Sequence, residues 1–488
     1  MTRRGKLPPG AAGVGDSVYS ALTIDDPEPA PAPVTPSRPA RPLGTIAFLK
    51  TVATNSLSAF DEELYDELVV PRRYLWQRVL FVSDPEGIKR VFLDNVDNYP
   101  RFRHIRRLFQ AGLGTGSLGT EGETWWRHRR ISAPALDHRA ILPDVPAMIA
   151  STERLIGALD TGDDSQVVDL EAVVSHLLIA LWNQVVTGGD PVAVPMLQGL
   201  AKYPRKPRLP DFTPLGPLLD PLRPKSQRRQ KIGMFDEVLY RLIDARRAAD
   251  YAGPHDLIWR LIHLRDRKTG ETLPREEVRD EAASVIAGGV SPTVRALTWI
   301  WYLLALNPHV EERLHAEIDA VLRGGPPVPS QLAELTYTRR VIDETMRLYP
   351  PIPGILREAA AADTICGHHV RPRSVIAILP WVVHRHRRLW SDPEHFDPDR
   401  FTAENAAARP RFAYVPFAGG PRICVGASFA MTQMLIVVAI LARRFRFRLV
   451  PEHPVRPVGR ISLHPFGGLR VRVERREAAN RSESALTA

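Results

Sequence analysis

Apolar residues recur at three- and four-residue spacing over most of the chain, and this periodicity predicts a mainly helical protein. The clearest helical segments are residues 84–96, 147–159, 235–249, 275–289, 296–306 and 310–322. Alternating apolar and polar positions, typical of strands, are fewer and occur at residues 73–82, 444–450 and 469–475. A Pro/Gly-rich segment able to close a hairpin separates the last two stretches. The pattern therefore predicts a mainly α protein with a small β domain.

The periodic pattern stops near both ends of the chain. Residues 1–44 are Pro-rich with little periodic apolar content, and residues 476–488 are small and polar, so both predict flexible tails. One folded domain is expected over residues 45–475. The uncharged run from Ile423 to Ala442 is close to membrane-spanning length, but it contains Gly, Ser, Thr and Gln. We expect it to form a buried core helix and predict no membrane anchor.

Composition limits the class of protein further. The 488 residues are 44% hydrophobic, which suits a globular fold, and include only two cysteines. Two cysteines are too few for a disulfide framework or a Cys-based zinc site, which indicates a reducing compartment such as the cytoplasm.

The formal net charge is +10, and basic residues cluster with aromatics at residues 101–107, 125–130 and 443–448. Such clusters raise the possibility of nucleic-acid binding or of acidic protein partners. No nucleic-acid module accompanies them, and no Gly-rich phosphate loop follows a predicted strand. We therefore predict no nucleic-acid partner.

The stretch PFAGGPRICVG, residues 416–426, places Cys424 in a Gly-rich turn before a long apolar helix. Backbone N–H groups at a helix start, and the cation Arg422, favour a thiolate at this position. A single thiolate cannot complete a tetrahedral metal site, but it can be the one protein ligand of a porphyrin iron. Cys366, by contrast, is interpreted as a packing residue.

This stretch resembles the cytochrome P450 superfamily, whose F-x-x-G-x-R-x-C-x-G motif is matched at Phe417, Gly420, Arg422, Cys424 and Gly426. The resemblance implies that Cys424 is the axial ligand of haem b and that Phe417 packs beside its sulfur. It also implies that Arg422 pairs with a haem propionate. Gly426 and Ala430 are expected to contact the haem.

Upstream segments resemble further motifs of the family. Glu344 and Arg347 match E-x-x-R, and with Arg400 they resemble a buried Glu-Arg-Arg triad that stabilises the scaffold rather than taking part in catalysis. Alone, the spacing of Glu344 and Arg347 carries little weight, because exposed pairs of this kind contribute only ~0.2 to 0.5 kcal/mol.

Two upstream positions are expected to hold the haem propionates. Arg357 follows a Pro-rich turn and is expected to supply one propionate cation. Residues 122–136 resemble the family helix with W-x-x-x-R, which Trp125 and Arg129 match. Trp126 and Arg130 have the same spacing, but the resemblance favours the first pair, because Pro134 then falls in the register of the family.

Residues 285–308 resemble the oxygen-binding helix of the family, with Ala287 and Gly288 at its Ala-Gly positions. The family usually has an acid and a threonine next, where this chain has Val290 and Ser291. We expect Ser291 to hold a water molecule beside bound O2. Pro292 lacks an N–H and should reinforce a local kink that opens backbone carbonyls.

The resemblance implies a helical prism around a buried haem and a cytoplasmic, monomeric monooxygenase. The enzyme would insert one atom of O2 into a hydrophobic small molecule. Its electrons would come from NAD(P)H through a separate reductase and a ferredoxin or flavodoxin-like donor. The basic clusters at 125–130 and 443–448 are predicted to dock that acidic donor.

The expected pocket is largely apolar, and we cannot rank terpenes, steroids, fatty acids and aromatics as substrates. Its expected walls are residues 101–122, 209–222 and 463–466, together with Ile352, Ile355 and Leu356. Two alternatives remain open: a haem-thiolate enzyme that uses peroxide or rearranges its substrate, and a basic nucleic-acid-binding protein.

Overall fold

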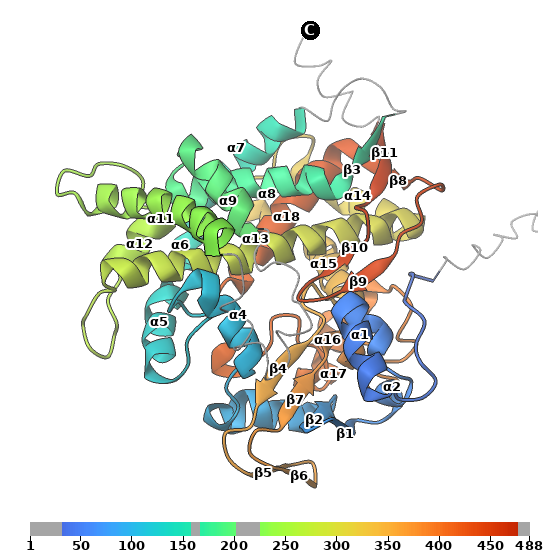
Figure 1. The fold of residues 1–488 in the computed structure, drawn as a ribbon. Helices are drawn as coiled ribbons and strands as arrows, with labels where there is room; N and C mark the ends of the chain where they lie inside the picture. Colours follow the sequence, from blue (N-terminus) through green and yellow to red (C-terminus); the bar gives the residue numbers. More distant parts are fainter. Residues whose placement is uncertain (1–31, 158–165, 202–224, 477–488) are drawn as a thin grey trace, which may run out of the picture. The chain divides into compact units, whose positions relative to one another are not determined.

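Helices form most of the chain in this computed structural model, which describes residues 32–157, 166–201 and 225–476. The helix α13 (Arg275–Leu306) runs through the middle of the described part (Figure 1). The other helices are α1 (Thr45–Asn55), α2 (Glu63–Asp66), α3 (Pro85–Lys89), α4 (Arg103–Leu113), α5 (Gly122–Ala135), α6 (His138–Ile141), α7 (Val145–Ile156), α8 (Leu170–Thr187), α9 (Val194–Ala201), α11 (Lys225–Arg247), α12 (Leu257–His263), α14 (Pro308–Leu322), α15 (Thr336–Leu348), α16 (Pro380–Val383), α17 (Ala403–Ala408) and α18 (Ala427–Arg444).

Short strands form separate small sheets, as the predicted fold class requires. One sheet has the order β1-β2-β7-β4, with β2 and β7 parallel and the other pairs antiparallel. A second has the order β3-β11-β8, and β9 pairs with β10 and β5 with β6. The strands are β1 (Val69–Tyr74), β2 (Gln77–Val82), β3 (Val167–Asp169), β4 (Ile355–Glu358), β5 (Asp363–Ile365), β6 (His368–Val370), β7 (Val375–Ile378), β8 (Phe445–Leu449), β9 (Pro457–Gly459), β10 (Leu463–Pro465) and β11 (Arg470–Arg475).

Two strand predictions have different outcomes. The pairing of the stretches at 444–450 and 469–475 is confirmed, because β8 and β11 are antiparallel neighbours. The stretch at 73–82 is not one strand: β1 ends and β2 begins within it. Leu75 turns the chain there with a positive φ of 55°, and Trp76 is exposed. The alternation of apolar and polar residues continues through this turn, so the sequence pattern does not reveal it.

The helix α13 organises the core. Two segments with separate helical patterns, 275–289 and 296–306, join into this one helix, which continues across Pro292. Glu276 and Glu277 lie in its first turn, where their negative charges interact favourably with the positive end of the helix dipole. The helix ends before Pro308, because a proline disfavours helical geometry at the residue that precedes it. Because α8, α9, α15 and α18 pack around it, α13 is buried on nearly all sides.

The ends of the described body are held by side-chain contacts. The N–H of Val34 donates to the Tyr302 hydroxyl, and the Tyr349 hydroxyl donates to the carbonyl oxygen of Val34. Residues 32–44 of the predicted tail are therefore anchored at this point. At the other end, Arg476 pairs with Asp319 at 2.7 Å. Residues 1–31 and 477–488 lie outside the described residues, and the boundaries 45–475 stay a prediction.

The uncharged run from Ile423 to Ala442 lies largely in α18. Among the described residues, α8 and α18 are long and apolar enough to cross a membrane, but 61% of each tested segment is buried inside the protein. The helix α18 packs against α7, α13, α14 and α15. Its surroundings are those expected of a core helix.

Candidate active site

The loop before α18 presents Cys424 to a large internal cavity. Gly420 has a φ of 64°, and a Cβ at this position would lie 1.8 Å from the carbonyl oxygen of Phe92. Only glycine permits this approach. The loop closes where the Cys424 N–H donates to the carbonyl oxygen of Phe417 at 2.9 Å. The Gly-rich sequence thus fixes the path that carries Cys424 to the cavity wall.

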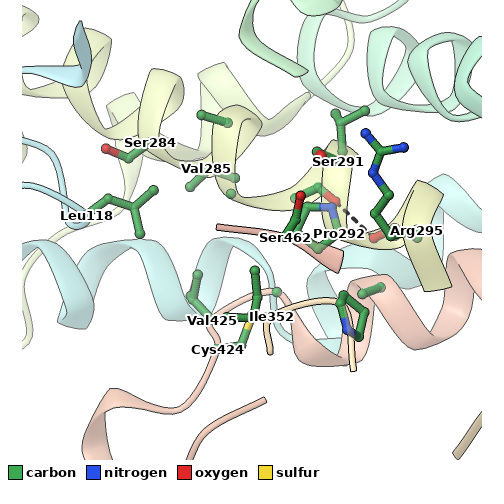
Figure 2. Close-up of a pocket in the computed structure, with 18 of the residues that line it drawn as sticks. Leu118, Ser284, Val285, Ser291, Pro292, Arg295, Ile352, Cys424, Val425 and Ser462 are labelled. Atoms are coloured by element: carbon green, nitrogen blue, oxygen red, sulfur yellow. Dashed lines mark hydrogen bonds between the residues drawn. The ribbon is translucent and has the colours of Figure 1, made fainter. Parts of the chain in front are cut away.

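The cavity has a volume of about 1490 Å³ and extends between the Cys424 loop and α13 (Figure 2). No side chain lies within 4 Å of an ideal Cβ at Gly426, and the nearest to one at Gly288 is Leu118 at 3.6 Å. Both glycines leave open space for a bulky flat ligand. Most of the predicted site residues line the cavity: Trp125, Arg129, Ala287, Gly288, Ser291, Phe417, Arg422, Cys424, Gly426 and Ala430.

The predicted pocket walls are only partly brought together. Ile352 and Ile355 line the cavity, and so does His464 from the predicted tip at 463–466. Leu356 packs against the hydrophobic core instead. The predicted wall at 209–222 lies outside the described residues.

Burial raises the pKa of Cys424, whereas the Gly426 N–H and the charge of Arg129 act in the opposite direction. The accessible surface of Cys424 faces the cavity. Arg422 was expected to be the cation that stabilises the thiolate. It instead pairs with Glu121 and lies over the Trp125 ring, 4.3 Å from its centroid. The positive charge that acts on Cys424 is that of Arg129, which lies in α5.

Arg101 and Arg422 line the cavity and share one carboxylate, whereas the predicted site residue Arg357 is buried near them without lining the cavity. Arg101 Nη1 lies 3.2 Å from Glu121 Oε1, and Arg422 also pairs with Glu121. Arg357 is 4% exposed, and burial together with the charges of Arg101 and Arg422 lowers its pKa to about 9. We call Arg101, Arg357 and Arg422 the buried arginine group. With Glu121 as their carboxylate partner, two positive charges remain without a counter-charge.

This charge imbalance tests whether the site fits a haem. Buried charges are costly unless they are paired, so the group requires a ligand with about two negative charges. Planar guanidinium groups bind carboxylates in a bidentate way. Haem carries two propionates, a flat ring and an iron that accepts a thiolate, and the cavity offers a partner for each. The residues present fit the group.

Across the cavity, α13 presents few proton donors. Val290 is buried and apolar, and Pro292 has no N–H to donate to the carbonyl oxygen of Gly288. In the view of Figure 2, Pro292 lies on the side of α13 toward Cys424, and Ser291 lies on the other side. Ser291 lines the cavity, but Pro292 lies nearer to the Cys424 side.

The predicted scaffold triad is brought together at α15, which contains Glu344 and Arg347. Arg347 and Glu344 are fully buried and form two hydrogen bonds, of 2.6 and 2.7 Å. Arg400 Nε lies 3.5 Å from Glu344 Oε1. Arg347 also donates to the carbonyl oxygens of His384, Pro393 and His395. The pair therefore joins α15 to the segment after α16.

The prediction for Cys366 needs correction, and one arginine of the site was not singled out from the sequence. Cys366 is exposed, in the turn between β5 and β6, where its thiol donates to Asp84 Oδ1 at 3.3 Å. It is not a packing residue, because a tight turn with a φ of 46° holds it at the surface. Arg101 was predicted only as part of the pocket wall at 101–122 and of the basic cluster 101–107, and no role of its own was assigned to it.

Two of the basic clusters contain arginines that pair with carboxylates of the protein itself. Arg443 and Arg444 both bind Glu153, and Arg448 binds Glu311 at 2.8 Å. In the cluster 125–130, the pairs are Arg127 with Glu277 and Arg130 with Asp266. These arginines therefore already have carboxylate partners within the protein, and the predicted docking face for an acidic donor stays a prediction.

Comparisons with known proteins agree with this geometry. The sequence profile described as Cytochrome P450 matches residues 44–465. "Cyclooctatin synthase" of Streptomyces melanosporofaciens is 36% identical over 388 residues, which cover 78% of this chain and 83% of that protein. "Cyclooctat-9-en-7-ol 5-monooxygenase" of the same organism is 29% identical over 77% of this chain and 81% of that protein.

Solved structures show the same fold. The heme domain of cytochrome P450DA is similar with a TM-score of 0.73 and 22% identity, over 84% of this chain and 90% of that domain. The match to the profile and the relative at 36% identity establish the family. The chain belongs to the cytochrome P450 family of haem-thiolate oxidoreductases.

Proposed function

We propose that this cytochrome P450 inserts one oxygen atom of O2 into a hydrophobic small molecule, with Cys424 as the axial ligand of its haem. The observation that carries the proposal is Cys424 at the wall of a cavity of about 1490 Å³, beside arginines that lack two counter-charges. A thiolate ligand and two propionates would satisfy both features at once.

Each chain residue has a distinct part in holding the group. Arg357, Arg422 and the newly identified Arg101 would bind the propionates, with Trp125 packed against Arg422. Arg129 would lower the cost of the Cys424 negative charge. The remaining contacts would come from Phe417, Gly426 and Ala430 on one side and from Ala287 and Gly288 on the other.

When bound, haem supplies the oxygen chemistry, in which RH, O2, two electrons and two protons give ROH and H2O. The chain has to position the substrate and deliver the protons. Gly288 leaves space beside α13, and Pro292 leaves the Gly288 carbonyl oxygen free to accept a hydrogen bond. Ser291 is proposed to hold a water molecule on this helix.

The substrate is proposed to be largely apolar and to carry an alcohol. Apolar side chains line much of the cavity, among them Leu108, Phe109, Val285 and Ile352. Ser462 lines it as well and offers a hydroxyl. The name of one relative, "Cyclooctat-9-en-7-ol 5-monooxygenase", describes oxidation of such a molecule. This likeness supports a cyclic alcohol over a fatty acid.

The two electrons are proposed to come from NAD(P)H through a reductase and a ferredoxin or flavodoxin-like donor, and the enzyme is proposed to act as a cytoplasmic monomer. Product formed with such a donor, compared with peroxide alone, tests this part. Turnover with peroxide only would replace the proposal by peroxygenase chemistry.

The ligand assignment is tested by replacing each cysteine in turn. Cys424→Ala should lose the thiolate signature in the spectrum of the ferrous carbonyl complex, because no other cysteine is among the described residues that line the cavity. Cys366→Ala is the matched control and should keep the wild-type spectrum, since Cys366 lies in the exposed turn between β5 and β6. A thiolate spectrum in Cys424→Ala would refute the assignment.

A further inference from the structure

Glu121 lies where the loop before α5 meets the buried arginine group. It is the last residue of the loop 114–121, which connects α4 to α5. Its side chain is 11% exposed and lies between two guanidinium groups. Glu121 Oε1 lies 3.2 Å from Arg101 Nη1, and Glu121 Oε2 pairs with Arg422. One carboxylate therefore faces two of the cations that are proposed to bind the haem propionates.

Contacts with Arg101 fix the position of Glu121. The backbone N–H of Arg101 donates to Glu121 Oε1 at 3.0 Å, in addition to the guanidinium contact. Arg101 Nη1 also donates to the carbonyl oxygen of Thr120 at 3.2 Å. The backbone of Arg101 is joined to β4 by the isolated β-bridge to Arg357. Glu121 therefore has a partner that does not depend on Arg422.

The loop that contains Glu121 is held against α13. Asp280 accepts hydrogen bonds from the backbone N–H of Thr115 at 2.6 Å and from its hydroxyl at 2.8 Å. Glu281 Oε2 accepts one from the backbone N–H of Ser117 at 2.7 Å. These bonds fix the loop, so the carboxylate of Glu121 is kept beside the arginines.

The contact between Glu121 and Arg422 is less complete. Arg422 is 9% exposed, and its Nε and Nη1 make no hydrogen bond to any described residue. Glu121 Oε2 makes none either, although it lies close enough to Arg422 Nη1 to form an ion pair. Arg422 thus attracts Glu121 by charge and keeps N–H groups for another acceptor. Because a planar guanidinium binds a carboxylate through two parallel bonds, a propionate would satisfy Arg422 better than Glu121 does.

Resting on the proposed function, we propose that Glu121 competes with haem for the buried arginine group and so limits how tightly this cytochrome P450 holds haem. Glu121 keeps Arg101 through the backbone and guanidinium contacts, and it shares Arg422 with a propionate. Three arginines and one carboxylate leave two positive charges, which two propionates neutralise. The same carboxylate lowers the cost of burying three cations when the chain folds.

Haem retention is tested with Glu121→Gln, which keeps the size of the side chain and removes its charge. The ferric holoprotein is mixed with excess apomyoglobin, and the visible spectrum reports the haem that leaves. Haem loss should be roughly tenfold slower than in the wild type, the lower end of what one hydrogen bond to a charged group contributes. Glu121→Asp keeps the charge on a shorter side chain, so its rate should lie between those of the other two proteins.

The stability of the full-length apoprotein separates competition from a merely structural role. Glu121→Gln should unfold at a lower urea concentration than the wild type, because three buried cations then lack their carboxylate. Haem retention and stability would change in opposite directions, whereas a residue that only supports the fold would lower both. Glu123→Gln is the matched control, since Glu123 lies two residues later but pairs with Arg130 and Lys268. It should leave the rate of haem loss unchanged.

Haem dimethyl ester, in which the propionates carry no charge, tests whether the competition takes place at the propionates. After reconstitution with this ester, the wild type and Glu121→Gln should lose it at equal rates. A difference that persists with the ester would overturn the proposal. Haem loss from Glu121→Gln that equals or exceeds the wild-type rate would do so as well, because Glu121 would then help to hold haem. Failure of the proposed function appears instead as an absent thiolate spectrum in the wild type.

Discussion

Two arginine-rich regions of the molecule differ in how their charge is balanced. In the buried arginine group, Arg101, Arg357 and Arg422 share one carboxylate, Glu121. In the cluster 443–448, which we call the strand arginine cluster, Glu153 and Glu311 each hold two arginines. Glu474 adds a further carboxylate to this cluster.

The difference shows which cations a ligand requires. Arginines that already have carboxylates stabilise the packing of α7, α14 and the β8–β11 sheet, and have little charge to offer a partner. Arginines that are buried with too few carboxylates destabilise the protein until an anion binds, because desolvation opposes their charge. A site for a dianionic ligand is therefore recognised by missing carboxylates, not by the number of arginines.

The largest expected effect comes from removing a cation of the buried arginine group. Arg357→Met should weaken haem binding to the apoprotein roughly 10- to 100-fold, since a hydrogen bond to a charged group contributes about 1.5–3 kcal/mol. The apoprotein should not lose stability, because the change relieves repulsion from Arg101 and Arg422. Haem titration and chemical unfolding measure the two quantities.

Arg444→Met is the control for this experiment and should have the opposite pattern. It should leave haem affinity unchanged while lowering stability slightly, because Arg444 binds Glu153 at 2.9 Å. Equal haem affinity in Arg357→Met and the wild type would remove the distinction between the two regions.

The sequence predicted the residues that a short motif holds together and missed those that folding brings together. Phe417, Arg422, Cys424 and Gly426 lie within ten positions, so their shared location follows from local spacing. Arg101 could not be distinguished from its basic neighbours. Its position at the cavity depends on an isolated backbone β-bridge between Arg101 and Arg357 of β4.

The carboxylate partners of the strand arginine cluster could not be predicted for the same physical reason. Arg443 meets its carboxylate partner Glu153 from 290 positions away, and Arg448 meets Glu311 from 137 positions away. Only the packing of α7 and α14 against α18 and β8 creates these pairs. The fold class was predicted correctly because helical periodicity is a local property of the chain, whereas ion pairing at such distances is not.

A smaller effect is expected from reversing a charge in the strand arginine cluster. Arg443→Glu should lower the free energy of unfolding by at least about 1 kcal/mol, the upper end for an exposed ion pair, because this pair is mostly buried and the change opposes Glu153. The salt dependence of reduction by a ferredoxin should match the wild type. Combining Arg443→Glu with Glu153→Arg should restore part of the stability. A slower reduction at unchanged stability would instead mark this cluster as a docking face.

The smallest expected effect on stability concerns His128. This residue belongs to the cluster 125–130, and two carboxylates contact its ring. Its Nε2 lies 2.8 Å from Glu277 Oε2, and its Nδ1 lies 3.2 Å from Glu281 Oε2. Burial lowers the pKa of His128, but hydrogen bonds and charge attraction from Glu281 and Glu277 outweigh it, so the pKa is raised. Arg127 also faces Glu277, and its charge competes for that carboxylate.

The sign of the pH dependence follows from this raised pKa. Below the unfolded pKa of about 6.5, the charged imidazole contributes its full stabilisation. As the pH rises through the higher folded pKa, the unfolded chain has already lost the proton, and the stabilisation is lost with a slope of at most about 1.4 kcal/mol per pH unit. His128→Gln should flatten the free energy of unfolding above pH 6.5 in urea titrations at several pH values. Parallel curves for the two proteins would show that His128 is neutral when folded, and that pairing with carboxylates does not by itself keep a buried cation charged.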